Sequence, residues 1–526
     1  MEQRVANPTI LWVDDEIDLL KSHIIFLTNK GYKLETTNSG ASAIDIIQAQ
    51  EIDLVFLDEN MPGLSGLETL ERIREIKPEL PIVFITKSDK ESLMEDAIGN
   101  KANDFLIKPV HPNQVLLAII KTLDYNKLVN KKTNLSYQQE FRSLSMDLDN
   151  AITWEDWVKL YKKLCKWDVD LTNIYDNSMH EILLRQKSEA NIQFCKFFEN
   201  NYVNWIQGKD SSNTPTLSHT LMRDKVFPLL SDDDKPLHLI TIDNLRYDQW
   251  LALQTIISQD FRIITNDVYC SIIPTTTQYA RNALFAGLMP LDIQNKYPSL
   301  WHCDENAKGS RNLNEAELLK MQLKREGLGS ITTTYNKISK HAEDKKLVNN
   351  YQQLLSGDLN VIICNFIDIM SHYSTDTEIV KELASDTTSY RSLVTSWFEN
   401  SGLFELLKIL KNSDCKIAIT TDHGSIQVKK PLKIIGDKTT TLNLRFKEGK
   451  HMAFDPNKVF LIENSNNIKI PMHYMSSSFI FAKESDYFIY QNNYNNYSNY
   501  YYNTFQHGGI SLEEVIIPYI VLKPKI

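Results

Sequence analysis

Long apolar runs are missing from this sequence of 526 residues. The N-terminus opens on charged and polar residues, and its first apolar run, residues 10–13, is far too short for a signal-peptide core. No later stretch reaches the roughly 18 consecutive apolar residues that a transmembrane helix needs. We therefore expect a cytoplasmic protein without membrane insertion.

Cysteine is scarce as well. The six cysteines are scattered, with no C-x-x-C pair and no dense framework of the kind that staples small secreted domains. This pattern favours a reducing compartment and argues against a zinc site built on thiolates.

Positive charge is in the minority. The chain has 57 Lys and Arg against 67 Asp and Glu, a formal net charge of −10. Tight, nonspecific DNA binding needs a basic face that displaces counterions, so we do not expect it. The sequence also lacks a recognisable basic helix-turn-helix, which disfavours a DNA-binding transcription factor.

What is present indicates three parts of an α/β protein. The length exceeds what one hydrophobic core usually serves, and 42% apolar with 24% charged residues is an ordinary globular composition. Strand and helix patterns alternate in residues 1–124, helical spacing alone fills 125–208, and alternation resumes in 209–526. The middle part is expected to be a bundle of roughly three helices.

The first part predicts a doubly wound parallel sheet. Strands are expected at residues 9–13, 32–36, 54–57, 82–85 and 104–107. Because the carboxyl ends of parallel strands line one crevice, five polar residues would meet there: Asp14, Asp15, Asp58, Thr86 and Lys108. Each alone has about even odds of being a solvated loop residue, but five in this order indicate a site.

The chemistry of that crevice is phosphoryl transfer. Three carboxylates around one point suit a hard ion such as Mg²⁺. Asp58 would be the nucleophile that becomes phosphorylated, Lys108 would neutralise phosphoryl oxygens, and Thr86 would hydrogen-bond the transferred group.

These residues resemble the response-regulator receiver family. The resemblance rests on the acidic pair at 14 and 15, the sequence DENMPGLSG at 58–66, Thr86, and the Lys-Pro pair at 108 and 109. It implies a flavodoxin-like fold, phosphorylation of Asp58 by a sensor histidine kinase, and Asn60 as a further residue of the Mg²⁺ site. Thr86, Lys108 and Phe105 would act as switch residues.

Acidic residues again follow expected strands in the third part. Strands at 237–242, 360–367 and 416–421 end at or beside Asp243, Asp368 and Asp422, and three histidines accompany them: His372, His423 and His507. Mixed carboxylate and imidazole ligands favour Zn²⁺ or Mn²⁺. Six ligands are too many for one tetrahedral ion and suggest two sites, as in phosphoryl displacement. A lone histidine is more often structural, but the ordered set outweighs that reading.

A nucleophile is expected in the run of three threonines after Pro274. A helix-like stretch follows, so a helix N-terminus would favour a bound phosphate, and a metal would make the threonine alkoxide accessible. Spacing alone leaves open whether Thr276 or Thr277 is the nucleophile.

Residues 236–522 resemble the alkaline phosphatase superfamily, and more narrowly the PglZ-type domain. The resemblance implies two Zn²⁺ ions, with Mn²⁺ as the alternative metal, in two sets: Asp243, Thr277, Asp422 and His423 for one, and Asp368, His372 and His507 for the other. Related enzymes place an arginine four residues and a glycine ten residues after the nucleophile, which Arg281 and Gly287 match from Thr277.

The sequence departs from that superfamily in two respects. It has no obvious third metal site, and it has threonine where sulfatases carry a modified Cys or Ser. A phosphodiester, with nucleotides as the leading class, is therefore expected as substrate. Of the weaker features, Arg445, Lys447 and Lys450 are interpreted as an exposed hairpin rather than phosphate contacts, and the Tyr-rich residues 487–502 as a mobile, polar surface loop rather than a base-stacking platform.

The order of the three parts resembles the PorX family of response regulators. That family implies signalling tied to the type IX secretion system, a phosphorylation-promoted homodimer, and a sigma factor or secretion-system component as downstream partner. The alternative function is a non-catalytic metal-binding effector that recruits a transcription or secretion factor.

Overall fold

The computed structural model describes residues 8–87, 102–119, 122–123, 136–137, 140–172, 177–209, 213–230, 235–301, 313–437, 440–474 and 476–525. Cys303 and the first part of the expected linker, residues 125–135, lie outside these ranges. The chain divides into two units, residues 1–136 and 137–526. Within the described ranges no helix is both long and apolar enough to cross a bilayer.

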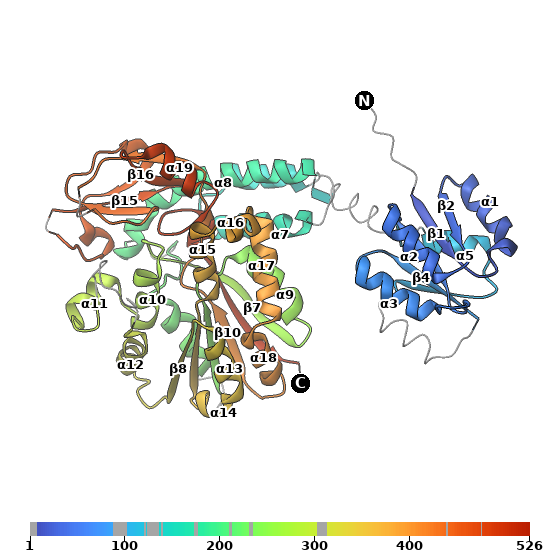
Figure 1. Ribbon diagram of the computed structural model, residues 1–526. Helices are drawn as coiled ribbons and strands as arrows, with labels where there is room; N and C mark the ends of the chain where they lie inside the picture. Colours follow the sequence, from blue (N-terminus) through green and yellow to red (C-terminus); the bar gives the residue numbers. More distant parts are fainter. Residues whose placement is uncertain are drawn as a thin grey trace. The chain divides into compact units, whose positions relative to one another are not determined.

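The first unit is a five-stranded parallel sheet with helices on both faces (Figure 1). Its strands run in the order β2-β1-β3-β4-β5, the flavodoxin-like order. The bounds are β1 Thr9–Val13, β2 Lys33–Thr37, β3 Leu54–Asp58, β4 Ile82–Thr86 and β5 Asp104–Ile107. All five expected strands are present, with β2 one residue later than predicted.

Helices cover this sheet in two pairs. They are α1 Lys21–Asn29, α2 Gly40–Ala49, α3 Gly66–Ile76 and α5 Pro112–Ile119. Side chains of α2 and α3 share one buried cluster with alternate residues of β1 and β3, and side chains of α1 and α5 share the other. Burial on both faces explains why β1, β3 and β4 are nearly continuous apolar runs.

The second unit is built on a six-stranded sheet in the order β7-β18-β10-β6-β9-β8. The strands are β6 Leu237–Ile242, β7 Phe261–Cys270, β8 Thr333–Ile338, β9 Leu359–Cys364, β10 Lys416–Thr420 and β18 Ile516–Pro524. Strand β18 runs antiparallel to both of its neighbours, whereas β10, β6, β9 and β8 are parallel. The carboxyl ends of β6, β9 and β10 therefore lie side by side.

Two expected strands end earlier than predicted. Strand β9 stops at Cys364 because α15 (Phe366–Asp376) begins two residues later, and β10 stops at Thr420. Asp368 consequently lies in the first turn of a helix rather than at the end of a strand.

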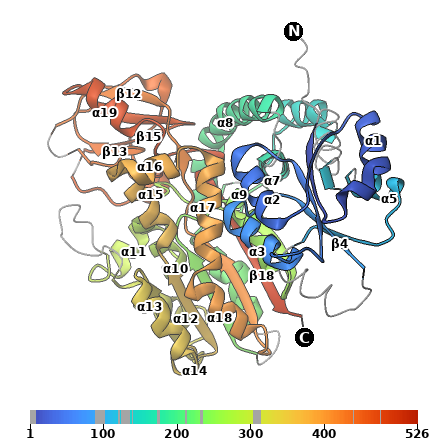
Figure 2. The ribbon, with the colours of Figure 1, turned by 45° about the vertical axis from the view of Figure 1, so that its right-hand side comes forward.

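Helices and smaller sheets complete this unit. The helices are α9 Tyr247–Ile257, α10 Thr277–Ala286, α11 Pro290–Lys296, α12 Glu315–Arg325, α13 His341–Asn349, α14 Tyr351–Leu354, α16 Glu378–Leu383, α17 Thr387–Glu399, α18 Gly402–Leu410, α19 Tyr494–Tyr501 and α20 Leu512–Val515. The further strands are β11 Ile426–Gln427, β12 Lys430–Ile434, β13 Phe446–Gly449, β14 Val459–Ile462, β15 Ser478–Ala482, β16 Asp486–Tyr490 and β17 Phe505–Gln506. Helices α9 and α17 pack against each other (Figure 2).

The helical middle segment belongs to this unit and packs against its sheet. Residues 140–149 are helical, and two long helices follow, α7 (Trp154–Thr172) and α8 (Asn177–Ile206). The aromatic stripe of α7, which includes Trp157 and Tyr161, is buried in the same cluster as the residues of β6 and β10. The linker helices and the sheet thus share one hydrophobic core.

Candidate functional site

The carboxyl end of the first sheet gathers three carboxylates. Asp14 and Asp58 are buried and Asp15 is exposed, and one oxygen of each lies within 4.8 Å of the others. The Lys108 Nζ atom lies 2.9 Å from Asp14 Oδ2 and 2.6 Å from Asp58 Oδ1. This oxygen-only set has the chemistry that Mg²⁺ prefers.

Burial and ion pairing shift the pKa values of both Asp58 and Lys108 in this crevice. Burial raises the pKa of Asp58, against the opposing hydrogen bond from Lys108. Burial would lower the pKa of Lys108, but its hydrogen bonds to Asp58 and Asp14 outweigh this and raise it. Lys108 therefore remains an ammonium ion, the state required to neutralise an incoming phosphoryl group.

The remaining receiver residues surround this crevice. Thr86 ends β4 and donates its hydroxyl to the carboxylate of Glu59. Phe105 in β5 is half-buried against the cluster beneath α2 and α3. Asn60, two residues after Asp58, is exposed.

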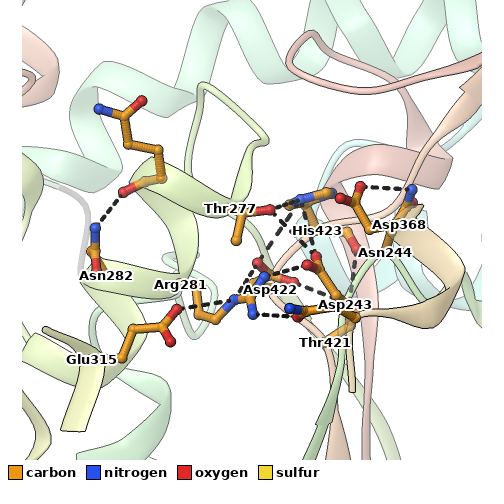
Figure 3. Close-up of polar contacts among 12 residues, drawn as sticks. Asp243, Asn244, Thr277, Arg281, Asn282, Glu315, Asp368, Thr421, Asp422 and His423 are labelled. Atoms are coloured by element: carbon orange, nitrogen blue, oxygen red, sulfur yellow. Dashed lines mark hydrogen bonds and ion pairs between the residues drawn. The ribbon is translucent and has the colours of Figure 1, made fainter. Parts of the chain in front are cut away.

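The second sheet positions the other candidate centre (Figure 3). Asp243 follows β6, Asp422 follows β10, and Asp368 comes from the start of α15. The side chains of Asp243 and Asp422 are almost completely buried, and that of Asp368 is 15% exposed. The neighbouring parallel strands β6 and β10 thus bring together Asp243 and Asp422, which are 179 residues apart in the chain.

Thr277 is the threonine that faces these ligands. It begins α10, and its Oγ1 atom lies 3.1 Å from His423 Nε2 and 3.4 Å from Asp243 Oδ1. The Thr276 hydroxyl is buried and has no hydrogen-bond partner within the described part of the chain. Thr275 instead donates its hydroxyl to the carbonyl of Gly509 at 2.9 Å.

Two overlapping donor sets occur here. Asp243, Asp422 and His423 each offer one atom within 4.8 Å of the other two, and so do Asp368, His423 and His507. The imidazole rings of His423 and His507 stack with their centroids 4.3 Å apart. Nitrogen and oxygen donors in this mixture fit Zn²⁺ or Mn²⁺, but His423 reaches both sets, whereas the resemblance assigns it to one.

His372 lies at the outer edge of this centre. Its Nε2 atom is 3.4 Å from Asp368 Oδ2, one helical turn away, and its side chain is 65% exposed. His507 Nε2 is 3.4 Å from the other oxygen of Asp368. The three residues that the resemblance assigns to the second ion are therefore neighbours.

Arg281 lies between two of the carboxylates rather than at an open surface. Its side chain is fully buried, donates to Asp243 and, at 3.0 Å, to Asp422, and its third contact is with Asn365 Oδ1 at 3.0 Å. Glu315 Oε1 lies 3.5 Å from Arg281 Nε. The guanidinium is thus shared among three buried carboxylates.

The electrostatics differ among the ligands. Burial raises the pKa of Asp243 despite Arg281, whereas for Asp422 the charges of Arg281 and His423 outweigh burial and lower its pKa. The pKa of Asp368 is lowered because its hydrogen bonds with His372 and His507 outweigh burial. Burial lowers the pKa of His423 to about 4, so its ring is neutral, as a metal ligand must be.

Three residues at this centre were not expected. Asn244 has a left-handed backbone (φ 66°), and its amide lies 3.5 Å from Asp368 Oδ1. Because Asn244 directly follows the expected ligand Asp243, the sequence could have indicated that it lies at this centre. Glu315 and Asn365 hold Arg281 from helix α12 and the loop before α15, and no local sequence pattern links them to it.

Two weaker expectations were wrong. The exposed hairpin is instead largely internal, because Arg445 is fully buried with both ends of its guanidinium on Glu514, at 3.2 and 2.6 Å. Lys447 is also buried and donates to the carbonyl of Thr441 at 2.8 Å, and only Lys450 is exposed. The Tyr-rich residues 487–502 form most of β16 and all of α19 rather than a loop.

Comparison with family models divides the chain into three matches. Residues 10–120 match the response regulator receiver domain, 127–206 the PorX response regulator linker domain, and 221–522 the BREX system PglZ alkaline phosphatase-like domain. The third match covers more than half of the chain.

Curated relatives match over a shorter range. The alginate biosynthesis transcriptional regulatory protein AlgB of Pseudomonas syringae pv. tomato is 37% identical over 129 residues, 24% of this chain and 29% of that protein. The transcriptional regulatory protein ZraR of Escherichia coli is 29% identical over 127 residues, with the same two shares. The chain thus spans less than a third of the length of these relatives. Among solved structures, Vibrio cholerae chemotaxis protein CheY4 is 27% identical, covers 22% of this chain and all of its own, and has a TM-score of 0.22.

Proposed function

The chain belongs to the PglZ alkaline phosphatase-like family, and from that premise we propose that it is a response regulator whose output domain is a metal-dependent phosphoric ester hydrolase. The receiver domain implies a histidine kinase as partner, and we propose Asp58 as the residue that is phosphorylated. Phosphodiesters, nucleotides foremost, are the proposed substrates, and two Zn²⁺ ions, with Mn²⁺ as the alternative, the proposed cofactors.

The main support for this proposal is the position of the Thr277 hydroxyl. Thr277 Oγ1 lies within 3.4 Å of both Asp243 and His423 at the first residue of helix α10. A helix N-terminus offers free N–H groups and partial positive charge to a phosphate. A substrate phosphate placed over this end of α10 would therefore have a nucleophile directly beneath it.

We assign the ligands from the two donor sets and from the resemblance, which adds Thr277 to one set and His372 to the other. Asp243, Asp422 and Thr277 would hold one ion, Asp368, His372 and His507 the other, with His423 within reach of both. Bound ions would supply Lewis-acid stabilisation of the attacking and leaving oxygens. Arg281 would hold Asp243 and Asp422 in position, because it is buried behind them and has no open path to the substrate.

Thr277 would carry the covalent step. Its oxygen forms a bond to phosphorus while the bond from phosphorus to the leaving alcohol breaks, and that alcohol departs with a proton. Attack of water on the same phosphorus then releases the phosphate ester and returns the Thr277 hydroxyl. In the described part of this unit, the acidic and histidine side chains form two ligand groups and no third, which favours diesters over monoesters.

The test is hydrolysis of a chromogenic diester, bis(p-nitrophenyl) phosphate. We expect Thr277→Ala to lower kcat/KM by about a thousand-fold or more, as removal of a nucleophile does, while Thr276→Ala, the matched control, retains activity. Chelation should abolish turnover and added Zn²⁺ restore it. Equal rates for the native chain, Thr277→Ala and the chelated protein would contradict the proposed hydrolase activity. They would favour the alternative, a non-catalytic metal-binding effector.

The linker match supports a cellular role like that of the PorX family. We propose that phosphorylation of Asp58 favours a homodimer and that the output acts in type IX secretion, through a sigma factor or a secretion-system component. This part of the proposal rests on the resemblance of the whole architecture and not on the catalytic centre.

A further inference from the structure

A cleft with several charged and polar residues in its lining lies where the linker helix α8 meets the rest of the second unit, and the catalytic proposal does not use it. Its volume is about 110 Å³, well above the roughly 10–15 Å³ that one water needs. One wall is a stripe of α8 that includes Lys187 and Asn191. The opposite wall includes Arg246, Ser425 and Lys429.

Arg246, in the lining of this cleft, has one unsatisfied hydrogen-bond donor among the described residues. The residue is 1% exposed, and its Nε and Nη2 atoms bind the carboxylate of Asp248 at 2.9 and 3.0 Å. Its cation lies 5.3 Å from the ring centroid of Tyr390 and 5.1 Å from that of Phe505. Nη1, however, is buried with no hydrogen-bond partner among the described residues, and such a group demands an explanation.

A second polar group in the lining is also unsatisfied. Ser425 is fully buried, and its hydroxyl has no partner in the described part of the chain. Lys429, at the rim, is exposed. Arg246, Ser425 and Lys429 thus all line one small space, and a guanidinium, a hydroxyl and an ammonium together match an oxyanion that accepts several hydrogen bonds.

The acids near the cleft are mostly neutralised already. Glu513 accepts a hydrogen bond from Asn191 at 3.0 Å and lies 3.8 Å from Lys187 Nζ. Asp248 is bound by Arg246 and by Arg391, at 2.9 Å. Glu484, half-buried in the lining, is the acid that has no ion pair within the described ranges.

We propose that this cleft is a second ligand site, which binds a small oxyanion: free phosphate or the phosphate group of a nucleotide. The site does not require the metal centre to be catalytic. Arg246 and Ser425 are its buried anchors, Lys429 closes its rim, and Glu484 weakens the affinity.

The cleft is lined by residues that lie close in sequence to candidate metal ligands. Arg246 comes three residues after Asp243, Ser425 two residues after His423, and Phe505 two residues before His507. The chain segments that carry three candidate metal ligands therefore turn back to line the cleft, and the linker helix faces them. An oxyanion bound here would contact both the linker helix and those segments. Its binding would therefore couple the linker helix to the positions of the candidate metal ligands.

Calorimetric titration of the full chain with inorganic phosphate tests this proposal. The protein is first chelated, which removes any phosphate binding that depends on metal. We expect one binding site whose Kd rises at least ten-fold in the double variant Ser425→Ala, Lys429→Ala. Neither side chain has a hydrogen-bond or ion-pair partner among the residues that the structure describes, so we expect folding to be preserved, which circular dichroism verifies. Glu484→Gln should tighten binding, and Lys320→Ala, an exposed lysine on α12, should leave it unchanged.

Adenosine 5′-monophosphate forms the second arm of the titration. Binding of inorganic phosphate identifies free phosphate as a sufficient ligand, whereas binding of the nucleotide alone identifies the esterified form. The proposal is overturned if neither binds the chelated chain, or if the double variant binds as tightly as the native chain. Because no step depends on Thr277, a failed hydrolase assay leaves this result unaffected.

Discussion

Arg281 illustrates how one buried side chain is divided among several partners. It contacts Asp243, Asp422 and Glu315, all almost fully buried. Glu315 in turn accepts the hydroxyl of Tyr335. A cation that is pulled back by Glu315 competes less strongly with a metal for the two aspartates, so Glu315 acts as a positioning residue behind the ligands.

Glu315→Gln should therefore weaken metal binding. Without the negative charge, Arg281 binds Asp243 and Asp422 more strongly, and we expect zinc affinity to fall by about 10- to 100-fold, the usual cost of losing a group behind a ligand. Zinc titration against a competing chelator measures this, and Glu315→Asp should restore part of the affinity. Glu317→Gln on the exposed side of the same helix α12 is the control. Unchanged zinc affinity in Glu315→Gln would make Glu315 purely structural.

At the scale of elements, strand β6 joins the edge that carries the candidate ligands to the core. It pairs with β10 and β9 on its two sides and ends one residue before Asp243. It also contains His238, which is 4% exposed and whose Nδ1 has no partner within the described residues. Burial lowers the pKa of His238 from 6.5 to about 4.

This burial predicts a loss of stability in mild acid. The unfolded chain takes up a proton on His238 below pH 6.5, whereas the folded chain does so only below about 4, so stability falls as the pH drops through that window. The contribution at pH 5 is about 2 kcal/mol. Urea unfolding at pH 7 and pH 5 should show a smaller difference for His238→Gln than for the native chain.

A matched control for this effect is His451→Gln, since His451 is exposed in the same unit. It should retain the full difference between pH 7 and pH 5. If His238→Gln and the native chain lost the same free energy of unfolding, the acid sensitivity would have to come from other groups, such as the half-buried His219, whose pKa is also lowered to about 4 by desolvation.

At the scale of the whole molecule, buried charge joins the linker helices to the rest of the second unit. Asp168 of α7 is fully buried, 2.9 Å from Lys187 of α8 and 3.5 Å from Arg391 of α17. The charges of these two partners outweigh burial and lower its pKa. Three helices, two of them from the linker, therefore meet at one carboxylate.

Asp168→Ala should destabilise the second unit by about 3 kcal/mol, because the buried Lys187 loses its nearest acid and the buried Arg391 keeps only Asp248. Asp260→Ala removes an ion pair with Lys411 in which both side chains are 37% exposed, and it should cost about 1 kcal/mol at most. Urea denaturation followed by tryptophan fluorescence compares the two. A change in Asp168→Ala no larger than in the control would mean that the linker helices are held by apolar packing alone.

The proposed dimerisation on phosphorylation is also a property of the whole chain. We expect beryllofluoride, a phosphoryl mimic, to shift the full chain from monomer to dimer, and Asp58→Asn to abolish the shift because the acceptor oxygen is lost. Sedimentation velocity provides the measurement. If the measured mass stayed that of a monomer in the presence of beryllofluoride, phosphorylation would not act through dimer formation.

The sequence alone determined the order of the elements and most of the residues at the strand ends. Asp14, Asp58 and Asp243 could be placed because parallel strands present their carboxyl ends at one edge, a rule that needs only the local pattern of each strand. The four-residue spacing of Asp368 and His372 likewise follows from one turn of helix. These inferences use short stretches of chain.

Only the tertiary structure decided what the long-range partners do. It turned Thr277, and not Thr276, toward the ligands, buried Arg445 on Glu514 from 69 residues away, and brought Arg281 between two carboxylates. It also merged the core of the linker helices with that of the sheet. Such pairings depend on packing between distant segments, and no periodicity or spacing within a segment encodes which of them will meet.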